Sequence, residues 1–225
     1  MSNVSITSPD WLVLKIHNKE LAKAIKGYAC GQLLDIGCGE KPYKNLTSYY
    51  VANHFGLDHP GSLHNKDSIN IFATAYDTAI KSGSIDTILC TAVLEHLERP
   101  RSAILEMSRV LKPGGYVILT APLYWHLHEE PRDFFRYTGY GLRYLFEEVG
   151  FEIVELRNLS GFWVTFGTEL SYYIQRFAKG PLVYAVRLFR ISLNVFMNLF
   201  DKSFLKDERF GWMYLTVARK PVCHT

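Results

Sequence analysis

The sequence feature that most constrains the fold is a short apolar run at residues 33–36 that leads directly into Gly37-Cys38-Gly39. A brief apolar run that ends in Gly-x-Gly is typical of a buried strand feeding a tight turn. Glycine lets the backbone approach a ligand closely. Because ligands of open α/β sheets bind outside the carboxyl ends of the strands, the motif predicts a binding site at the end of the first strand.

Strand and helix signals alternate along the rest of the chain. Strands are predicted at 54–57, 69–72, 85–91, 116–121, 151–156 and 212–218, and helices at 10–28 and 140–149. A third helix begins at Pro100 and is predicted to end at Pro113-Gly114-Gly115, and Asp10 is the predicted cap of the first helix. This alternation predicts an α/β fold around a mostly parallel sheet.

The segment between the last two predicted strands is too long for a loop in a compact domain. It is predicted to form two helices, at 165–178 and 182–203, separated by Gly180-Pro181. The predicted organisation is therefore an N-terminal helix or cap (1–30), a main domain (31–159 and 212–225) and a helical insert (160–211).

The second helix of the insert combines one narrow polar stripe with an apolar remainder. The stripe consists of Arg187, Arg190, Asn194, Asn198 and Asp201. The two arginines argue against a membrane span, because each would cost about 2.5–3.5 kcal/mol at the bilayer centre. Three interpretations stay open: a cap over the active site, a homodimer contact, or an interfacial helix in peripheral contact with a membrane. The width of the apolar surface favours burial against protein.

Composition excludes several classes of protein. A length of 225 residues, 48% of them hydrophobic and 21% charged, argues against disorder, collagen and a disulfide scaffold. The net charge of +3 is too small to indicate a nucleic-acid partner, and the insert, with seven basic and four acidic residues, accounts for all of it. The spacing of the four cysteines is not that of a metal site: Cys30, Cys38, Cys90 and Cys223. Because cysteines are few and no signal peptide is evident, a cytoplasmic location is expected.

A second binding element is Asp58, directly after the predicted strand at 54–57. A carboxylate about 20 residues beyond the glycine motif can accept hydrogen bonds from both hydroxyls of a ribose. The third glycine of the dinucleotide fingerprint is replaced by Pro42. The pattern therefore favours an adenosine-containing ligand without a required pyrophosphate over a nicotinamide dinucleotide.

Four motifs occur in order along the chain: LLDIGCG at 33–39, GLD at 56–58, IDTILCTAVLEH at 85–96 and LKPGG at 111–115. Together they resemble the class I S-adenosylmethionine-dependent methyltransferases, in particular the methyltransferase domain whose fourth strand runs into V-L-E-H. The resemblance covers roughly residues 30–160 and the last strand. It implies a Rossmann-like seven-stranded sheet with an antiparallel last strand, and an enzyme whose cofactor is S-adenosyl-L-methionine.

The same resemblance implies roles for individual residues. Asp35, Gly37, Cys38 and Gly39 would lie along the methionine end of the cofactor, Asp58 would bind the ribose, and Thr91, Ala92 and Val93 would line the cofactor after the fourth strand. His96 is a candidate for the cofactor pocket or for a base. The chain departs from the family at Glu40-Lys41, where Thr-Gly is common.

Residues 126–138 form a second block of titratable side chains after the fifth predicted strand. Histidine is the side chain best suited to accept a proton near neutral pH. The candidate catalytic residues are His128, His126 and Asp133, and the candidate substrate contacts are Arg132, Arg136 and Tyr137. No metal is predicted, because His-x-His without a nearby cysteine is a weak metal signal.

This block resembles, more loosely, a segment of methyltransferases associated with bacterial surface-glycan synthesis. The predicted function is therefore transfer of a methyl group to oxygen on a small-molecule or glycan acceptor. Two alternatives stay open: a non-catalytic S-adenosylmethionine-binding or scaffold protein, and a nicotinamide-dependent oxidoreductase, which Pro42 disfavours.

Overall fold

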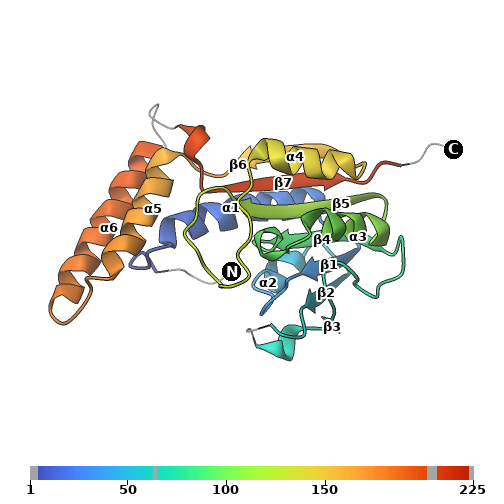
Figure 1. Cartoon of the computed structure of the whole chain (residues 1–225), viewed down its shortest axis with the longest axis horizontal. Helices are drawn as coiled ribbons and strands as arrows, with labels where there is room; N and C mark the ends of the chain where they lie inside the picture. Colours follow the sequence, from blue (N-terminus) through green and yellow to red (C-terminus); the bar gives the residue numbers. More distant parts are fainter. Residues whose placement is uncertain (1–4, 63–64, 202–206, 223–225) are drawn as a thin grey trace.

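The computed structural model describes residues 5–62, 65–201 and 207–222. One seven-stranded sheet organises the chain, in the order β3-β2-β1-β4-β5-β7-β6, and β7 alone runs opposite to its neighbours (Figure 1). The strands are β1 (Gln32–Ile36), β2 (Asn53–Asp58), β3 (Ile71–Phe72), β4 (Ile85–Thr91), β5 (Leu111–Pro122), β6 (Glu152–Asn158) and β7 (Met213–Arg219). The predicted Rossmann-like fold with an antiparallel last strand is confirmed.

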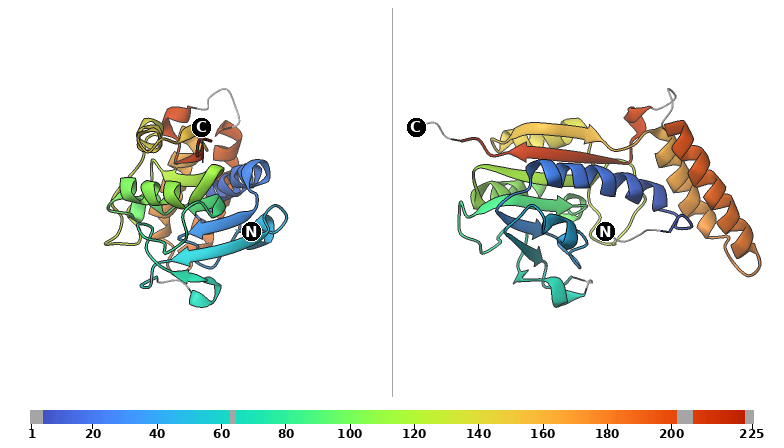
Figure 2. Two further views of the ribbon diagram at one scale, coloured as in Figure 1. Left: turned by 90° about the vertical axis from the view of Figure 1, so that its right-hand side faces the viewer. Right: turned by 180° about the vertical axis from the view of Figure 1, so that it is seen from behind.

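Helices cover both faces of this sheet (Figures 1 and 2). On one face α3 (Pro100–Val110) and α4 (Gly139–Glu148) bury Ile104 and Phe146 in the larger apolar cluster. On the other face α1 (Trp11–Tyr28) buries Leu21 and Ile25 in a second cluster that includes Leu33 of β1. The central strands are therefore apolar on both sides, as their continuous hydrophobic runs predict. A short helix, α2 (Lys44–Thr47), follows the loop after β1.

Some predicted boundaries are wrong. Helix α3 ends at Val110, and β5 begins at once with Leu111, which pairs with Ile85 of β4. The register shifts before Tyr116 pairs with Thr87, so Pro113-Gly114-Gly115 forms an irregularity within β5 and does not end the helix. Asp10 precedes α1 but caps no helix N–H with its side chain, which instead accepts a hydrogen bond from the Ser8 hydroxyl.

The insert forms a pair of antiparallel helices between β6 and β7, α5 (Phe162–Gln175) and α6 (Leu182–Asp201), which we call the α5–α6 hairpin. Parallel strands β1, β4 and β5 point their carboxyl ends toward the side from which this hairpin projects (Figures 1 and 2). Its root packs against α1, and Val164 and Met197 belong to the apolar cluster on that face of the sheet. By length and composition, α6 is the one helix among the described residues that could cross a membrane.

Within one chain, the orientation of α6 is the reverse of the predicted one. Arg190, Asn194 and Asp201 of the polar stripe are buried, whereas most of the apolar side chains on the rest of the helix are partly or fully exposed. Within this chain the apolar surface of α6 is therefore largely uncovered, and burial against a second copy or contact with a membrane stays a prediction. The amphipathic pattern was identified correctly, but the polar side chains find partners between the helices and at the root of the hairpin.

Candidate functional site

The glycine motif forms a sharp loop at the carboxyl end of β1. Gly37 and Gly39 have φ of +67° and +48°, values that favour glycine. A Cβ added at Gly37 would lie 2.3 Å from Cγ2 of Val93, so a side chain at this position would clash with the segment that follows β4. The loops after β1 and β4 are therefore packed together, and the two sets of residues predicted to bind the cofactor lie at one edge of the sheet.

Asp58 connects the glycine loop to the end of β2. Its Oδ2 accepts a hydrogen bond from the Gly39 N–H at 2.9 Å, and its Oδ1 accepts one from the His59 N–H at 2.7 Å. Each carboxylate oxygen has a second acceptor site. Asp58, which the sequence predicts to bind a ribose, thus lies beside the glycine loop and can accept further hydrogen bonds.

Asp35 lies at the buried end of β1, where Oδ2 is 3.0 Å from Nε2 of His54 on β2. Burial raises the pKa of Asp35, and the neighbouring His54 opposes this effect. The sequence analysis missed His54. The parallel register pairs Asp35 with Gly56, so His54, two residues earlier on β2, projects on the same face as Gly56. Only the strand register could have revealed the pair.

The chain turns abruptly after Thr91, the last residue of β4. Ala92 has φ of +52°, in the left-handed region that is unfavourable for a side chain. Its N–H donates to the Thr120 carbonyl at 3.0 Å and lies 3.2 Å from the Thr120 hydroxyl, which is itself 3.2 Å from Nε2 of His17. Strained backbone that the surroundings hold in place is common at ligand sites. The turn directs the following residues, including Val93, toward the glycine loop.

Glu95 is a functional candidate that the sequence analysis did not single out. It belongs to a short 3-10 helix, η2 (Leu94–His96), and its side chain is 1% exposed. Both of its carboxyl oxygens are buried without a hydrogen-bond partner among the described residues, and burial raises the pKa of the group to about 8. A buried polar group without a partner is rare in folded proteins, and it often marks a position that a ligand satisfies.

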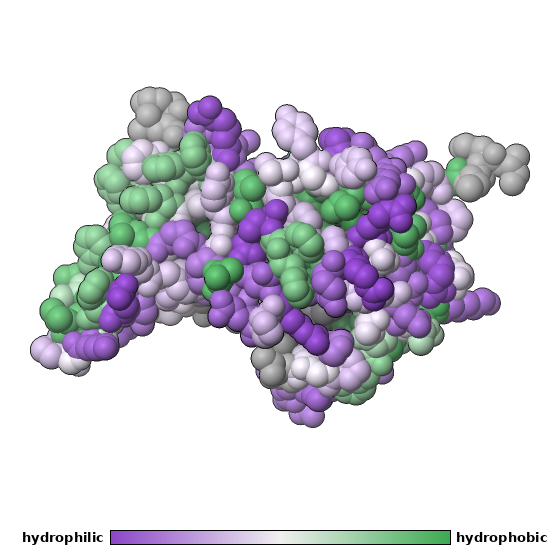
Figure 3. Space-filling model, viewed as in Figure 1, coloured by the Kyte–Doolittle hydropathy of each residue, from purple (hydrophilic) through white to green (hydrophobic). Residues whose placement is uncertain are grey.

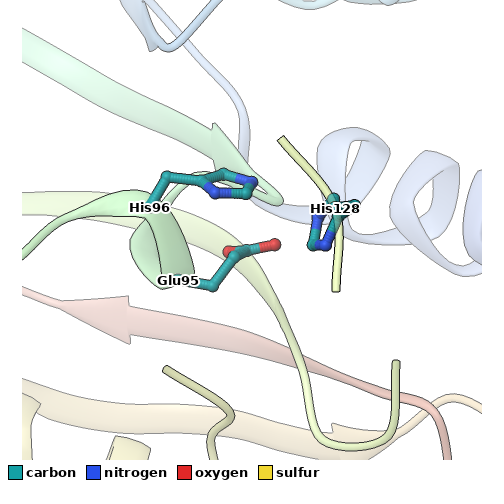
Figure 4. Close-up of side chains that lie close together, drawn as sticks. All are labelled: Glu95, His96 and His128. Atoms are coloured by element: carbon teal, nitrogen blue, oxygen red, sulfur yellow. The ribbon is translucent and has the colours of Figure 1, made fainter. Parts of the chain in front are cut away.

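Glu95, His96 and His128 point toward one another in what we call the carboxyl-end cluster (Figure 4). The imidazole rings of His96 and His128 are 4.8 Å apart in an edge-on arrangement. Nδ1 of His96 lies 2.6 Å from the Arg132 carbonyl oxygen, to which it donates, and Nε2 lies 3.8 Å from Oε2 of Glu129. The Phe134 N–H donates to the Glu95 carbonyl, which joins η2 to the 126–138 segment.

Asp133 lies beside the imidazole of His128 and binds its backbone. Oδ2 of Asp133 lies 3.3 Å from Nδ1 of His128 and accepts a hydrogen bond from the His128 backbone N–H at 3.0 Å. Arg136 holds Asp133 in turn through two bonds of 2.6 and 2.8 Å, which keeps the pKa of the carboxyl well below its usual range. Burial lowers the pKa of His128, so its imidazole is neutral at pH 7 and able to accept a proton.

His126 lies elsewhere. Its ring packs against Trp125 and Tyr172, with centroids 4.8 and 4.4 Å away, and its Nδ1 is 3.4 Å from Glu169 of α5. Of the two histidines predicted as bases, the structure therefore brings only His128 into the carboxyl-end cluster. The catalytic role of either histidine stays a prediction.

The three candidate substrate residues occupy different environments. Arg132 is exposed. Arg136 is engaged with Asp133 and with the carbonyls of Trp125 and His126. The Tyr137 ring is buried and its hydroxyl donates to the Leu94 carbonyl at 3.0 Å. Only Arg132 has a side chain free to contact a substrate without first giving up one of these bonds.

The carboxyl-end cluster has the composition of a metal site. Its ligand atoms lie within 4.8 Å of one another, whereas two bonds of about 2.1 Å to one ion span no more than about 4.2 Å. The side chains are thus spaced more loosely than a bound ion requires. We therefore do not assign them as metal ligands, and the absence of a metal stays a prediction.

Comparison with known proteins shows which family part of this chain matches and which proteins share its fold. Residues 34–119 match the family described as "Methyltransferase domain". A ubiquinone biosynthesis O-methyltransferase from Cupriavidus pinatubonensis is 29% identical over 107 residues, which cover 43% of each protein. A tRNA (carboxymethyluridine(34)-5-O)-methyltransferase from Arabidopsis thaliana is 30% identical over 124 residues, 52% of this chain and 30% of that protein. The chain thus spans less than half the length of these relatives.

Solved structures agree on the fold. A putative methyltransferase bound to the Trm112 activator of Haloferax volcanii gives a TM-score of 0.61 at 17% identity, covering 93% of this chain and 90% of that one. A SAM-dependent methyltransferase from Archaeoglobus fulgidus gives 0.60 at 16% identity, covering 92% and 94%. The fold is thus the one that S-adenosylmethionine-dependent methyltransferases share, and residues 34–119 match their domain. The four motifs lie within this matched segment or at its edge. The looser resemblance to surface-glycan enzymes gains no support from these relatives.

Proposed function

We propose that this protein transfers the methyl group of S-adenosylmethionine to a hydroxyl oxygen on a small-molecule or glycan acceptor. The single observation behind this proposal is the orphaned, buried carboxyl of Glu95, which faces the neutral imidazole of His128 next to the segment that packs on the glycine loop. An acceptor hydroxyl placed between these groups would form a hydrogen bond with each of them. The oxygen specificity is supported by the names of both curated relatives, each of which denotes an O-methyltransferase.

The residues predicted to bind the cofactor fit this ligand. The glycine loop presents backbone without Cβ atoms, and Asp58 keeps acceptor capacity for a ribose. In the proposal, Asp35, Gly37, Cys38 and Gly39 line the methionine end, and Thr91, Ala92, Val93 and His96 line the remainder. When bound, the cofactor supplies an electrophilic methyl carbon, which requires a nucleophile held in line at about 3 Å.

This chain's own residues would position and deprotonate the acceptor. His128 Nε2 accepts the hydroxyl proton, while Asp133 holds the imidazole in place and stabilises the cation that forms. Glu95, protonated at neutral pH because of its raised pKa, offers an O–H to the acceptor. Arg132 is placed to contact an anionic or hydroxyl-rich part of the substrate.

The free thiols of Cys30, Cys38 and Cys90 are in keeping with the proposed cytoplasmic location, and Cys223 lies outside the described residues.

Release of S-adenosylhomocysteine tests the proposal. The purified protein is incubated with S-adenosylmethionine and panels of phenols, polyprenyl phenols, sugars and, as a separate arm, total tRNA. We expect turnover with a hydroxyl acceptor that His128→Asn reduces while cofactor binding, followed by thermal shift, is retained. Cofactor binding without turnover on any panel would favour the scaffold alternative, and turnover with tRNA would contradict the predicted absence of a nucleic-acid partner.

A further inference from the structure

The α5–α6 hairpin has its polar side chains inside and its apolar side chains outside. Arg190 donates to the Gln175 side chain of α5, and the Asn194 amide donates to the Ile6 carbonyl at 3.0 Å. Asp201 accepts a hydrogen bond from the Gly161 N–H at 2.9 Å. Three residues of the polar stripe of α6 thus hold the hairpin together and to the body, whereas Arg187 of the same stripe is exposed. The rest of the helix surface is left to face outward.

That outward surface is apolar and rich in aromatic residues. Leu188 and Leu199 of α6 are 68% and 61% exposed, and other large side chains of the hairpin are also exposed: Phe166, Tyr173, Phe177, Leu182, Tyr184, Phe189, Val195 and Phe196. Figure 3 shows apolar side chains gathered along the hairpin in the view of Figure 1. Exposing an apolar surface of this kind to water costs free energy. Contiguous apolar patches on proteins that remain in water are therefore small. We call it the apolar hairpin face.

Beyond the root of the hairpin, where Glu169 and Asp201 lie, the charges around the apolar hairpin face all have one sign. Residues 170–200 contain Arg176, Lys179, Arg187 and Arg190 and no acidic residue. Of these, Arg176, Lys179 and Arg187 are exposed. A two-fold interface with a second copy would bring the same patch of each copy together, and therefore cation against cation. Exposed aromatic and aliphatic side chains interspersed with arginine and lysine instead match an anionic lipid surface.

The position of the hairpin connects this surface to the candidate active site. An apolar pocket of about 190 Å³ lies at the hairpin root, lined by Tyr124, Phe162, Thr165, Phe166, Glu169 and Phe210. Glu169 in turn lies 3.4 Å from His126, two residues before His128 in the chain. The hairpin projects from the edge of the sheet at which the parallel strands end (Figure 1). A bilayer on the apolar hairpin face would therefore lie on the same side of the molecule as the acceptor site.

We propose that the apolar hairpin face binds the surface of an anionic lipid bilayer, with the apolar side chains among the lipid headgroups and the three exposed cations at the phosphates. The inward polar stripe keeps the hairpin at the interface, because Arg190 and Asp201 remain bonded to protein. A further consequence rests on the proposed function: the acceptor is an amphiphile that reaches the carboxyl-end cluster from the membrane, with its apolar part in the pocket at the hairpin root.

Vesicle cosedimentation tests the proposal without cofactor or acceptor, so its outcome is independent of the methyltransferase activity. Vesicles contain phosphatidylcholine alone or with 30% phosphatidylglycerol. We expect at least tenfold tighter binding to the anionic vesicles.

Leu188→Glu combined with Leu199→Glu should weaken that binding at least tenfold. Leu105→Glu, at a comparably apolar but remote site that is 42% exposed on α3, is the matched control and should bind like wild type. Thermal unfolding confirms that the variants fold.

Two kinds of result, in vesicle binding and in oligomeric state, would overturn the proposal. One is binding that the hairpin double variant leaves unchanged, or an absence of vesicle binding by the folded wild-type protein. The other is a dimer in light scattering that persists with anionic vesicles present and dissociates in the hairpin double variant, which would assign the face to a second copy. If vesicle binding holds but no acceptor is methylated, the membrane contact stands and the proposed function fails.

Discussion

The carboxyl-end cluster and the α5–α6 hairpin differ in the main group that they leave without a partner among the described residues: a whole buried carboxyl in the cluster, and an extended apolar surface on the hairpin. At the cluster, Glu95 is buried and its polar atoms have no partner among the described residues. On the hairpin, the buried polar atoms of Asn194 and Asp201 are bonded, and it is apolar surface that has no cover. A buried polar group without a hydrogen-bond partner indicates a site for a small polar ligand, whereas an exposed apolar face indicates a surface for an extended apolar partner. The contrast separates a site for chemistry from a surface for docking.

The largest expected effect concerns the two histidines of the 126–138 segment. His128→Asn should lower kcat by about 10²–10⁴-fold, because it removes the positioned base. His126→Asn is the matched control and should cost much less, since His126 contacts Trp125, Tyr172 and Glu169 outside the cluster. Steady-state kinetics with a turned-over acceptor measures both. Equal losses for the two variants would remove the distinction that the structure draws.

The buried His17 should make the stability of the body depend on pH. Burial lowers the pKa of His17 to about 4 from an ordinary value of 6.5, so the folded state favours the neutral imidazole. The stabilisation is complete above pH 6.5 and is lost as the pH falls from 6.5 through 4. The loss amounts to about 3 kcal/mol by linkage. Urea unfolding at pH 7.5, 5.5 and 4.0, with His17→Gln as reference, should show a smaller decrease in the variant.

Packing between the hairpin helices rests on a glycine. A Cβ at Gly167 of α5 would lie 2.5 Å from Cγ of Met197 on α6, so Gly167→Ala should destabilise the hairpin by about 1–3 kcal/mol. Hydrogen exchange should rise in α5 and α6 while the sheet stays protected. Gly27→Ala, in α1 where a Cβ would meet nothing within 4 Å, is the matched control for an added methyl group in a helix. Unchanged exchange in the hairpin would show that the helices do not need this close contact.

Glu95 should set an upper pH limit on the reaction. Its pKa of about 8 means that the O–H it offers to the acceptor is lost above that pH, and the rate should then fall about tenfold per pH unit. Glu95→Gln keeps a donor that does not ionise, so the alkaline decrease should disappear while activity at pH 7 is largely retained. An alkaline decrease that persists in this variant belongs to another group.

The smallest effect concerns single charges of the hairpin. Arg187→Ala should weaken binding to anionic vesicles about fivefold, in line with roughly 1 kcal/mol per basic side chain near a charged membrane. Binding to phosphatidylcholine vesicles should not change. Lys81→Ala, at an exposed residue outside the hairpin, is the charge-matched control. A loss with the control variant as large as that with Arg187→Ala would mean that net charge, and not this face, drives the binding.

Much of the cofactor side of the site could be predicted from local sequence. Each motif lies where one strand ends and its loop begins: the apolar run at 33–36 with the glycines that follow, and Asp58. The hydrogen bond from the Gly39 N–H to Asp58 joins these two motifs. Glu95 could not be predicted in the same way. Its burial and its lack of a partner depend on how the 126–138 segment folds over η2, which involves residues more than thirty positions away.

The sequence by itself determined the class of fold, the strand-end position of the binding motifs and the amphipathic character of the insert, because each follows from short-range periodicity and turn chemistry. Only the tertiary structure decided which side of α6 faces the protein. Arg190, Asn194 and Asp201 of its polar stripe turn inward because they find hydrogen-bond partners on α5, in the N-terminal segment at Ile6 and at the start of the insert at Gly161. It also decided that His128 and not His126 joins Glu95, since the direction of a side chain in an irregular segment is set by contacts remote in sequence.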